Sequence, residues 1–251
     1  MSMPFWAVEA AEQFWRQAGT PPAFPRDLRP AVALALPLSV TYLPRLRTSD
    51  VDAYLRRRGI ACALAAGSRP LHACLIAYRE SGFVFVDGAD PPDEQRFSLA
   101  HEVAHFMHDH LRPRRHAAAR LGASALEVLD GRRAATAAER YGAILRDVSL
   151  TPFVHLTERS TKGEVFAAVV EEAESAADLL AYELLAPADG VRERCTDAAS
   201  AAHELEETYG LPAGPARRYA ALLFPDVGDA ALLRGLQRVL RSWDADSGRD
   251  G

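Results

Sequence analysis

Residues 94–110 restrict the fold of this chain more than any other segment, because they combine a helical period with three ionisable side chains. Small or apolar residues recur along one side of the predicted helix, at Phe97, Ala100, Ala104 and Met107. His101 and His105 are four residues apart, so their imidazoles project from one face and can converge on one ion. Glu102 follows about 100° around the helix, where it can still reach a water held by that ion.

The spacing His101-Glu102-x-x-His105 is typical of zinc hydrolases, in which the two histidines bind the metal and the glutamate is the general base. Because the flanking residues are apolar, the motif is expected to be buried. Burying two imidazoles and a carboxylate is unfavourable unless they are paired or bind a metal. We therefore favour a metal centre over a surface helix with unrelated histidines. The predicted ion is Zn²⁺, with Mn²⁺ as an alternative, since imidazole and carboxylate ligands suit several ions.

A catalytic zinc commonly has three protein ligands, so the chain must supply one more. The metzincin pattern is excluded, because it requires glycine and histidine or aspartate where this chain has His108 and Leu111. Asp109 is a candidate, since it lies four residues after His105. His108 and His110 are expected to contact solvent or the end of the helix, where positive charge is favoured.

Glu174 is the stronger candidate for the third ligand. Glu174 and Asp178 are four residues apart in the predicted helix 164–186, which Pro187 ends, so they share one face. One carboxylate would bind the metal, and Asp178 would accept the other ring N–H of a ligand histidine. On spacing alone, a solvated acidic face is equally well supported.

Periodicity and turn residues predict a mainly helical chain with a small sheet. Helices are expected at residues 4–18, 50–58 with Ser49 as N-cap, 114–129, 133–147, 196–209, 212–224 and 229–243. Strands are expected at 60–65, 71–78 and 83–87, with a hairpin turn at 80–82 and a short extended piece at 153–157. Residues 20–37 contain five prolines and are expected to form an extended connection.

Composition indicates the compartment and the classes of partner that are expected for this protein. The chain has 251 residues and a net charge of −5, which gives no overall attraction to nucleic acid or anionic lipid. Three sparse cysteines (Cys62, Cys74 and Cys195) do not form a disulfide framework. Neither a signal peptide nor an apolar stretch long enough to span a bilayer is evident. We expect a cytoplasmic protein without a membrane partner.

Two segments resemble motifs of the ImmA/IrrE metallopeptidase family. Residues 96–105 read Arg-Phe-Ser-Leu-Ala-His-Glu-Val-Ala-His, and residues 174–187 are similar to the family's second motif, with Leu180 and Ala186 replacing its usual phenylalanine and methionine. Residues 205–223 look like its C-terminal helical pair. The resemblance raises Glu174 from an even candidate to the expected third ligand.

The resemblance implies an α+β, mainly helical, zincin-like fold with a small sheet, an active-site helix, a third-ligand helix and a C-terminal helical bundle. It implies a metallopeptidase domain over residues 1–190 with a helical insertion at about 111–160, a helical region at 191–243 and a tail at 244–251. It also implies an endopeptidase that cleaves a helix-turn-helix repressor and so acts as an antirepressor in stress response or mobile-element control. Substrate would add as a strand to an exposed edge of the 71–87 hairpin.

Two non-catalytic functions remain as alternatives. The predicted helices within 196–224 are weakly similar to a helix-turn-helix, with Arg217 and Arg218 on the second helix. Two arginines on an acidic chain make a poor DNA footprint, so direct nucleic-acid binding is not expected. The other alternative is a zincin-fold protein that binds a partner without hydrolysis, against which the intact Glu102 argues.

Overall fold

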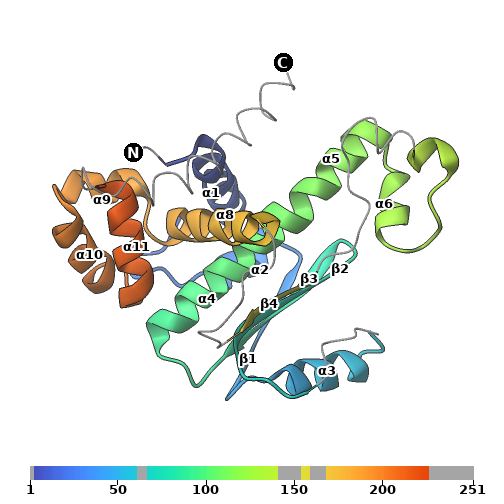
Figure 1. Ribbon diagram of the computed structural model, residues 1–251, viewed down its shortest axis with the longest axis horizontal. Coiled ribbons are helices and arrows are strands. Elements are labelled where there is room, and N and C mark those ends of the chain that lie inside the picture. Colours follow the sequence, from blue (N-terminus) through green and yellow to red (C-terminus); the bar gives the residue numbers. More distant parts are fainter. Residues whose placement is uncertain (1–2, 61–66, 141–153, 159–167, 226–251) are drawn as a thin grey trace. The chain divides into compact units, whose positions relative to one another are not determined.

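The computed structural model describes residues 3–60, 67–140, 154–158 and 168–225 (Figure 1). The chain forms two compact units. The sheet unit comprises residues 32–162, and the helical unit comprises residues 1–31 together with 163–251. Helices predominate and the sheet is small, as expected for an α+β protein.

The sheet has four strands in the order β1-β3-β2-β4. They are β1 (Leu38–Leu43), β2 (Leu71–Tyr78), β3 (Ser81–Asp87) and β4 (Val154–Glu158). The predicted hairpin is confirmed as antiparallel β2 and β3, while β1 pairs with β3 in parallel and β4 pairs with β2 antiparallel. The expectation that the hairpin offers an exposed edge is therefore wrong, because β1 and β4 occupy both of its edges.

The hairpin turn consists of Arg79 and Glu80, whereas the sequence predicted a turn at residues 80–82. Tyr78 pairs with Ser81, and Arg79 adopts a positive φ of 56°. Gly82 is therefore a strand residue, and its lack of a side chain serves packing. A Cβ at Gly82 would lie 2.8 Å from Leu38 Cδ2 and 3.1 Å from Phe106 Cε2, closer than side chains normally approach.

Helices α3 (Thr48–Arg57) and α4 (Pro92–His105) lie on opposite faces of the sheet (Figure 1). The core beneath α3 consists of Leu46, Val51, Leu55, Leu71, Cys74, Ile76 and Phe85. On the other face, α4 contacts β2 and β3. The predicted Ser49 N-cap is wrong: α3 begins at Thr48, and Asp50 Oδ2 accepts a 3.0 Å hydrogen bond from the Arg47 N–H.

The helical segment after α4 is more broken than predicted. A π-helix, η1 (Phe106–Leu111), follows directly, and then α5 (Arg112–Leu121) and α6 (Ala125–Leu129). The predicted single helix 114–129 is wrong, because Gly122 ends α5 with a φ of 89°. Glycine adopts that left-handed backbone without the steric penalty of a Cβ.

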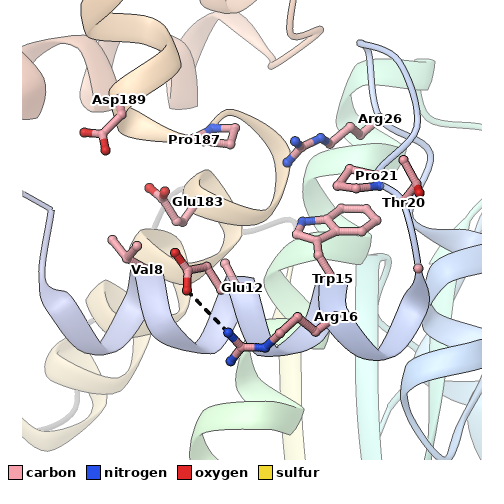
Figure 2. A pocket seen from close by; sticks show the side chains of 12 residues that line it. Val8, Glu12, Trp15, Arg16, Thr20, Pro21, Arg26, Glu183, Pro187 and Asp189 are labelled. Atoms are coloured by element: carbon pink, nitrogen blue, oxygen red, sulfur yellow. Dashed lines mark ion pairs between the residues drawn. The ribbon is translucent and has the colours of Figure 1, made fainter.

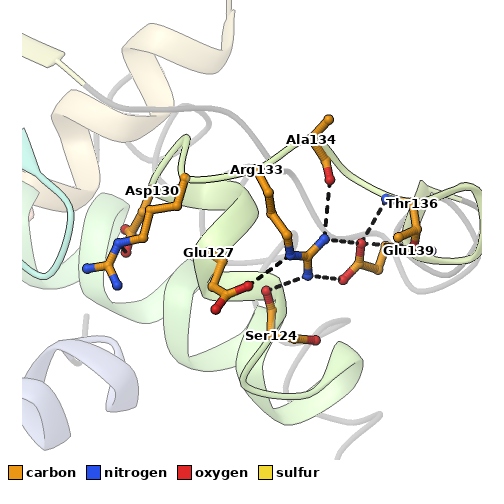
Figure 3. Close-up of polar contacts among 8 residues, drawn as sticks. Ser124, Glu127, Asp130, Arg133, Ala134, Thr136 and Glu139 are labelled. Atoms are coloured by element: carbon orange, nitrogen blue, oxygen red, sulfur yellow. Dashed lines mark hydrogen bonds and ion pairs between the residues drawn. The ribbon is translucent and has the colours of Figure 1, made fainter.

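Arg133 holds the chain against α6 (Figure 3). Its guanidinium donates to Glu127 Oε2 at 2.9 Å, to both Glu139 oxygens at 2.8 and 2.5 Å, and to the Ser124 carbonyl at 2.8 Å. These bonds lower the pKa of Glu139 to about 2, with the Arg133 hydrogen bond as the main cause. Nearby, Arg114 forms a buried 2.8 Å ion pair with Asp130. Part of the basic sequence in this region is thus neutralised locally.

The helical unit contains α1 (Phe5–Ala18), α8 (Ala168–Leu185), α9 (Ala188–Arg194), α10 (Ala198–Glu207) and α11 (Ala213–Leu223). Helix α1 packs on α8 through an apolar stripe that buries Ala7, Ala11, Phe14 and Trp15. Pro187 ends α8 as predicted, and the chain re-enters a helix at once as α9, which was not expected. Tyr219 stacks on Tyr182 and donates a 3.0 Å hydrogen bond to the Ala186 carbonyl, which fixes α11 to the end of α8.

Other expectations need correction or lie outside the described residues. Residues 20–37 are not wholly extended, since α2 (Arg29–Ala35) forms a helix with Pro30 in its first turn, where proline is tolerated. The predicted helix 133–147 is wrong at its start, because residues 133–136 are not helical; residues 137–140 are helical, and 141–147 lie outside the described residues. The predicted strand 60–65, except Ile60, and the predicted helix 229–243 also lie outside the described residues. Within the described ranges, no helix is long and apolar enough to cross a bilayer.

Candidate metal site

Helix α4 brings the two predicted ligand histidines together. His101 and His105 lie one turn apart on the same face, and their Nε2 atoms are 3.1 Å from each other. The rings are nearly perpendicular, with an interplanar angle of 76° and centroids 4.6 Å apart. Both are buried, at 6% and 0% exposure. The sequence prediction that these imidazoles converge is borne out in their geometry.

The spacing of these nitrogens fits two ligands of one ion. With Zn–N bonds of about 2.0–2.1 Å in a tetrahedral site, two ligand nitrogens are about 3.3 Å apart. The observed 3.1 Å is close to that separation. Two nitrogen lone pairs that face each other at this distance repel unless a proton or a cation lies between them. The pair is therefore a chemically suitable site for a divalent metal.

Asp109 fixes the orientation of the His105 ring. Asp109 Oδ2 lies 2.6 Å from His105 Nδ1, and its other oxygen contacts His108 Nδ1. Burial alone raises the pKa of the Asp109 carboxyl, but the hydrogen bonds from His105 and His108 outweigh burial and lower that pKa to about 2. The ionised carboxylate can only accept, so His105 Nδ1 carries the proton. The Nε2 lone pair of His105 is then directed at His101.

This arrangement argues against Asp109 as the third ligand, because it occupies the side of the His105 ring opposite to Nε2. The expectation of solvent contact for His110 is wrong. His110 is buried, and its Nε2 donates a 2.7 Å hydrogen bond to the Arg79 carbonyl. Burial lowers the pKa of His110, which favours its neutral ring. His110 thus joins η1 to the β2–β3 turn.

Glu102 is buried on the same helix, with 0% exposure. Every α4 residue from Phe97 to His105 is buried, so the local environment excludes bulk water. A carboxylate removed from water needs a compensating charge or hydrogen-bond donors. A cation at the neighbouring histidine pair would supply such a charge.

Glu174 and Asp178 both lie on α8, in the helical unit, and each is half-buried. Asp178 Oδ2 lies 4.0 Å from Arg218 Nη2 on α11. The assignment of Glu174 as third ligand and of Asp178 as its supporting carboxylate stays a prediction. For His105, the orienting role that was expected of Asp178 belongs to Asp109.

From the sequence, Asp109 was a candidate third metal ligand, whereas in the structure its carboxylate contacts His105 Nδ1. Its position four residues after His105 was the available signal. The π-helical turn that places it against Nδ1 has no recognisable sequence pattern.

Paired imidazoles and a buried glutamate on α4, with the Asp109 carboxylate on the following π-helix, form an arrangement suited to a metal-dependent hydrolase. Comparison with known families agrees: residues 66–139 match the peptidase family model described as the IrrE N-terminal-like domain. The match confirms the resemblance to the ImmA/IrrE family over this segment, which contains His101, Glu102, His105 and Asp109 and ends before Glu174. No curated protein matches the chain. For this segment, the match to a metallopeptidase family implies a metal ion and a protein substrate.

Proposed function

We propose that this protein is a zinc-dependent endopeptidase in which His101, His105 and Glu174 bind the metal and Glu102 is the general base. The observation that carries the proposal is the pair of buried Nε2 atoms 3.1 Å apart, with Asp109 holding His105 in the tautomer that a metal requires. The three ligand side chains would offer two imidazole nitrogens and a carboxylate oxygen, a donor set used by catalytic zinc.

A bound divalent cation would supply Lewis-acid chemistry, lowering the pKa of water and polarising the peptide carbonyl. Glu102 would accept the proton of the attacking water and deliver it to the leaving amine. Asp109 would keep His105 in one orientation throughout, and Asp178 would support the ligand set from α8. The closed surroundings of Glu102 would strengthen each of these electrostatic interactions.

The proposed substrate is a helix-turn-helix transcriptional repressor in the cytoplasm, and its cleavage would relieve repression in stress response or mobile-element control. This part of the proposal is supported by the match to the IrrE N-terminal-like domain. A DNA-binding role for α10 and α11 is less well supported, since Arg218 on α11 lies 4.0 Å from Asp178.

Hydrolysis can be tested with a Glu102→Gln variant beside an Asp93→Asn control from the first turn of α4. Each is loaded with zinc, incubated with purified helix-turn-helix repressors, and assayed for cleavage by mass spectrometry. We expect Glu102→Gln to keep its metal and lose about 10²–10⁴-fold in rate, while Asp93→Asn cleaves as the wild type does. Equal cleavage by Glu102→Gln would remove Glu102 from the mechanism. Metal-loaded wild type that binds a repressor without cleaving it would instead support the non-catalytic alternative.

A further inference from the structure

The helical unit contains a cavity that the proposed peptidase chemistry does not use. Its volume is about 710 Å³, within the range of small-molecule sites. It lies between α1, the segment 19–26 and the junction of α8 with α9. Its lining residues all belong to the helical unit, and Figure 2 shows their side chains surrounding the space.

One side of the cavity is formed by a buried cation and an aromatic ring. Arg26 and Trp15 are 8% and 9% exposed, and both line the cavity. Arg26 uses Nη1 to donate a 2.7 Å hydrogen bond to the Leu184 carbonyl, and its guanidinium lies 5.0 Å from the Trp15 ring centroid. Because a guanidinium forms strong charge-assisted hydrogen bonds with carboxylates, an anionic group of a ligand suits this side of the cavity.

The opposite side of the cavity is acidic. Glu183 is buried, and Asp189 lies beyond it at the start of α9 (Figure 2). Glu183 Oε2 accepts a 3.2 Å hydrogen bond from the Ala188 N–H, which satisfies part of its capacity. Burial raises the pKa of Glu183, so a ligand cation placed beside it would relieve the cost of its ionised form.

The wall between the two charged sides is apolar and includes Val8, Ala11 and Pro187, with Pro21 next to the Trp15 ring. Glu12 and Arg16 also line the cavity, where they form an exposed ion pair with 3.6 Å between Arg16 Nη1 and Glu12 Oε2. We propose that this cavity binds a small zwitterion with an apolar body, namely a free amino acid or a dipeptide. Its carboxylate accepts from the Arg26 guanidinium, its ammonium faces Glu183, and its side chains pack on the apolar wall.

The proposal is tested by titration calorimetry of the full chain with leucylleucine, its N-acetyl derivative and its C-terminal amide. The Glu102→Gln background prevents hydrolysis from contributing heat. We expect leucylleucine to bind with a Kd below about 1 mM. Each derivative lacks one charge and should bind about tenfold more weakly or worse, because a charge-assisted hydrogen bond is lost.

Two variants test whether leucylleucine binds in this cavity. Arg26→Gln removes the positive charge but keeps an amide that can donate to the Leu184 carbonyl, and Glu183→Gln removes the negative charge but keeps an acceptor for the Ala188 N–H. Each should weaken leucylleucine binding about tenfold, with folding checked by circular dichroism. The control Arg217→Gln, exposed on α11 and not part of the cavity lining, should change leucylleucine binding less than about twofold. The proposal is overturned if the protein with an unaltered cavity does not bind leucylleucine at millimolar concentration. It is also overturned if both cavity variants bind leucylleucine as tightly as that protein does, or if the two derivatives bind as tightly as leucylleucine.

Discussion

The carboxylate of Asp109 accepts a 2.6 Å hydrogen bond from His105 Nδ1, across the point where α4 becomes a π-helix. The consequence is chemical: the proton is held on Nδ1, and the lone pair on Nε2 is left available to a metal ion. π-helical turns are rare and often occur at functional sites. The change of helix type after His105 thus accompanies the side-chain arrangement that prepares the histidine as a ligand.

Asp109→Asn is expected to weaken metal binding by about 10–100-fold, because the charge that fixes the His105 tautomer is lost. Competition with a chromogenic chelator measures the affinity. Asp90→Asn is the matched control, since Asp90 Oδ2 also contacts a histidine, His72 Nδ1, at 2.8 Å. Equal zinc affinity in both variants would contradict the orienting role of Asp109.

Gly82→Ala should destabilise the sheet unit by about 1–3 kcal/mol, because the added methyl would press on Leu38 and on Phe106. Phe106 directly follows His105, so the strain also reaches the site. Gly88→Ala is the control, since its nearest neighbour would be an ordinary 3.7 Å away. The unfolding midpoints of both variants are measured in urea by circular dichroism. A Gly82→Ala midpoint no lower than that of Gly88→Ala would show that the close packing is not needed.

Stability of the helical unit should fall as pH rises above about 4.5, where an unfolded glutamate ionises. Burial raises the pKa of Glu183 above its ordinary 4.5, although the Ala188 N–H works in the opposite direction. Between the ordinary and the raised pKa the folded state binds more protons than the unfolded state, so ionisation opposes folding.

The matching experiment compares urea midpoints at about pH 5 and about pH 7 for the wild type, Glu183→Gln and the exposed control Glu193→Gln. In Glu183→Gln, the urea midpoint should decrease less between the two pH values than in the wild type. Near neutral pH, this variant should be at least as stable as the wild type. Glu193→Gln should retain the wild-type slope. Identical slopes in all three proteins would mean that Glu183 does not titrate between folded and unfolded states as described.

The features predicted correctly from sequence are local ones. The hairpin and α4 follow from alternation and helical period over short stretches, and the His101–His105 pair needs only the geometry of one helix turn. Strand β1 was missed, because it follows a proline-rich stretch and its partner β3 lies some forty residues away along the chain. Parallel pairing at that distance leaves no local signature.

The sequence predicted that a site exists more readily than it predicted how the side chains of that site are arranged. A helix of constant 3.6-residue period does not predict the π-helical turn, so Asp109 could be placed near His105 but not against Nδ1. The cavity beside Arg26 was not anticipated either. Its walls come from residues 8–26 and 183–189, which only tertiary packing of α1 on α8 brings together.

The most direct test of the central claim is the zinc content of purified wild-type protein beside His101→Ala, Glu174→Ala and a Glu171→Ala control from the exposed face of α8. Elemental analysis should find about one zinc per chain in the wild type and the control, and a sharp loss in both ligand variants. Full zinc retention by Glu174→Ala would contradict the proposed third ligand. A wild-type protein that takes up no metal after reconstitution would contradict the metallopeptidase account itself.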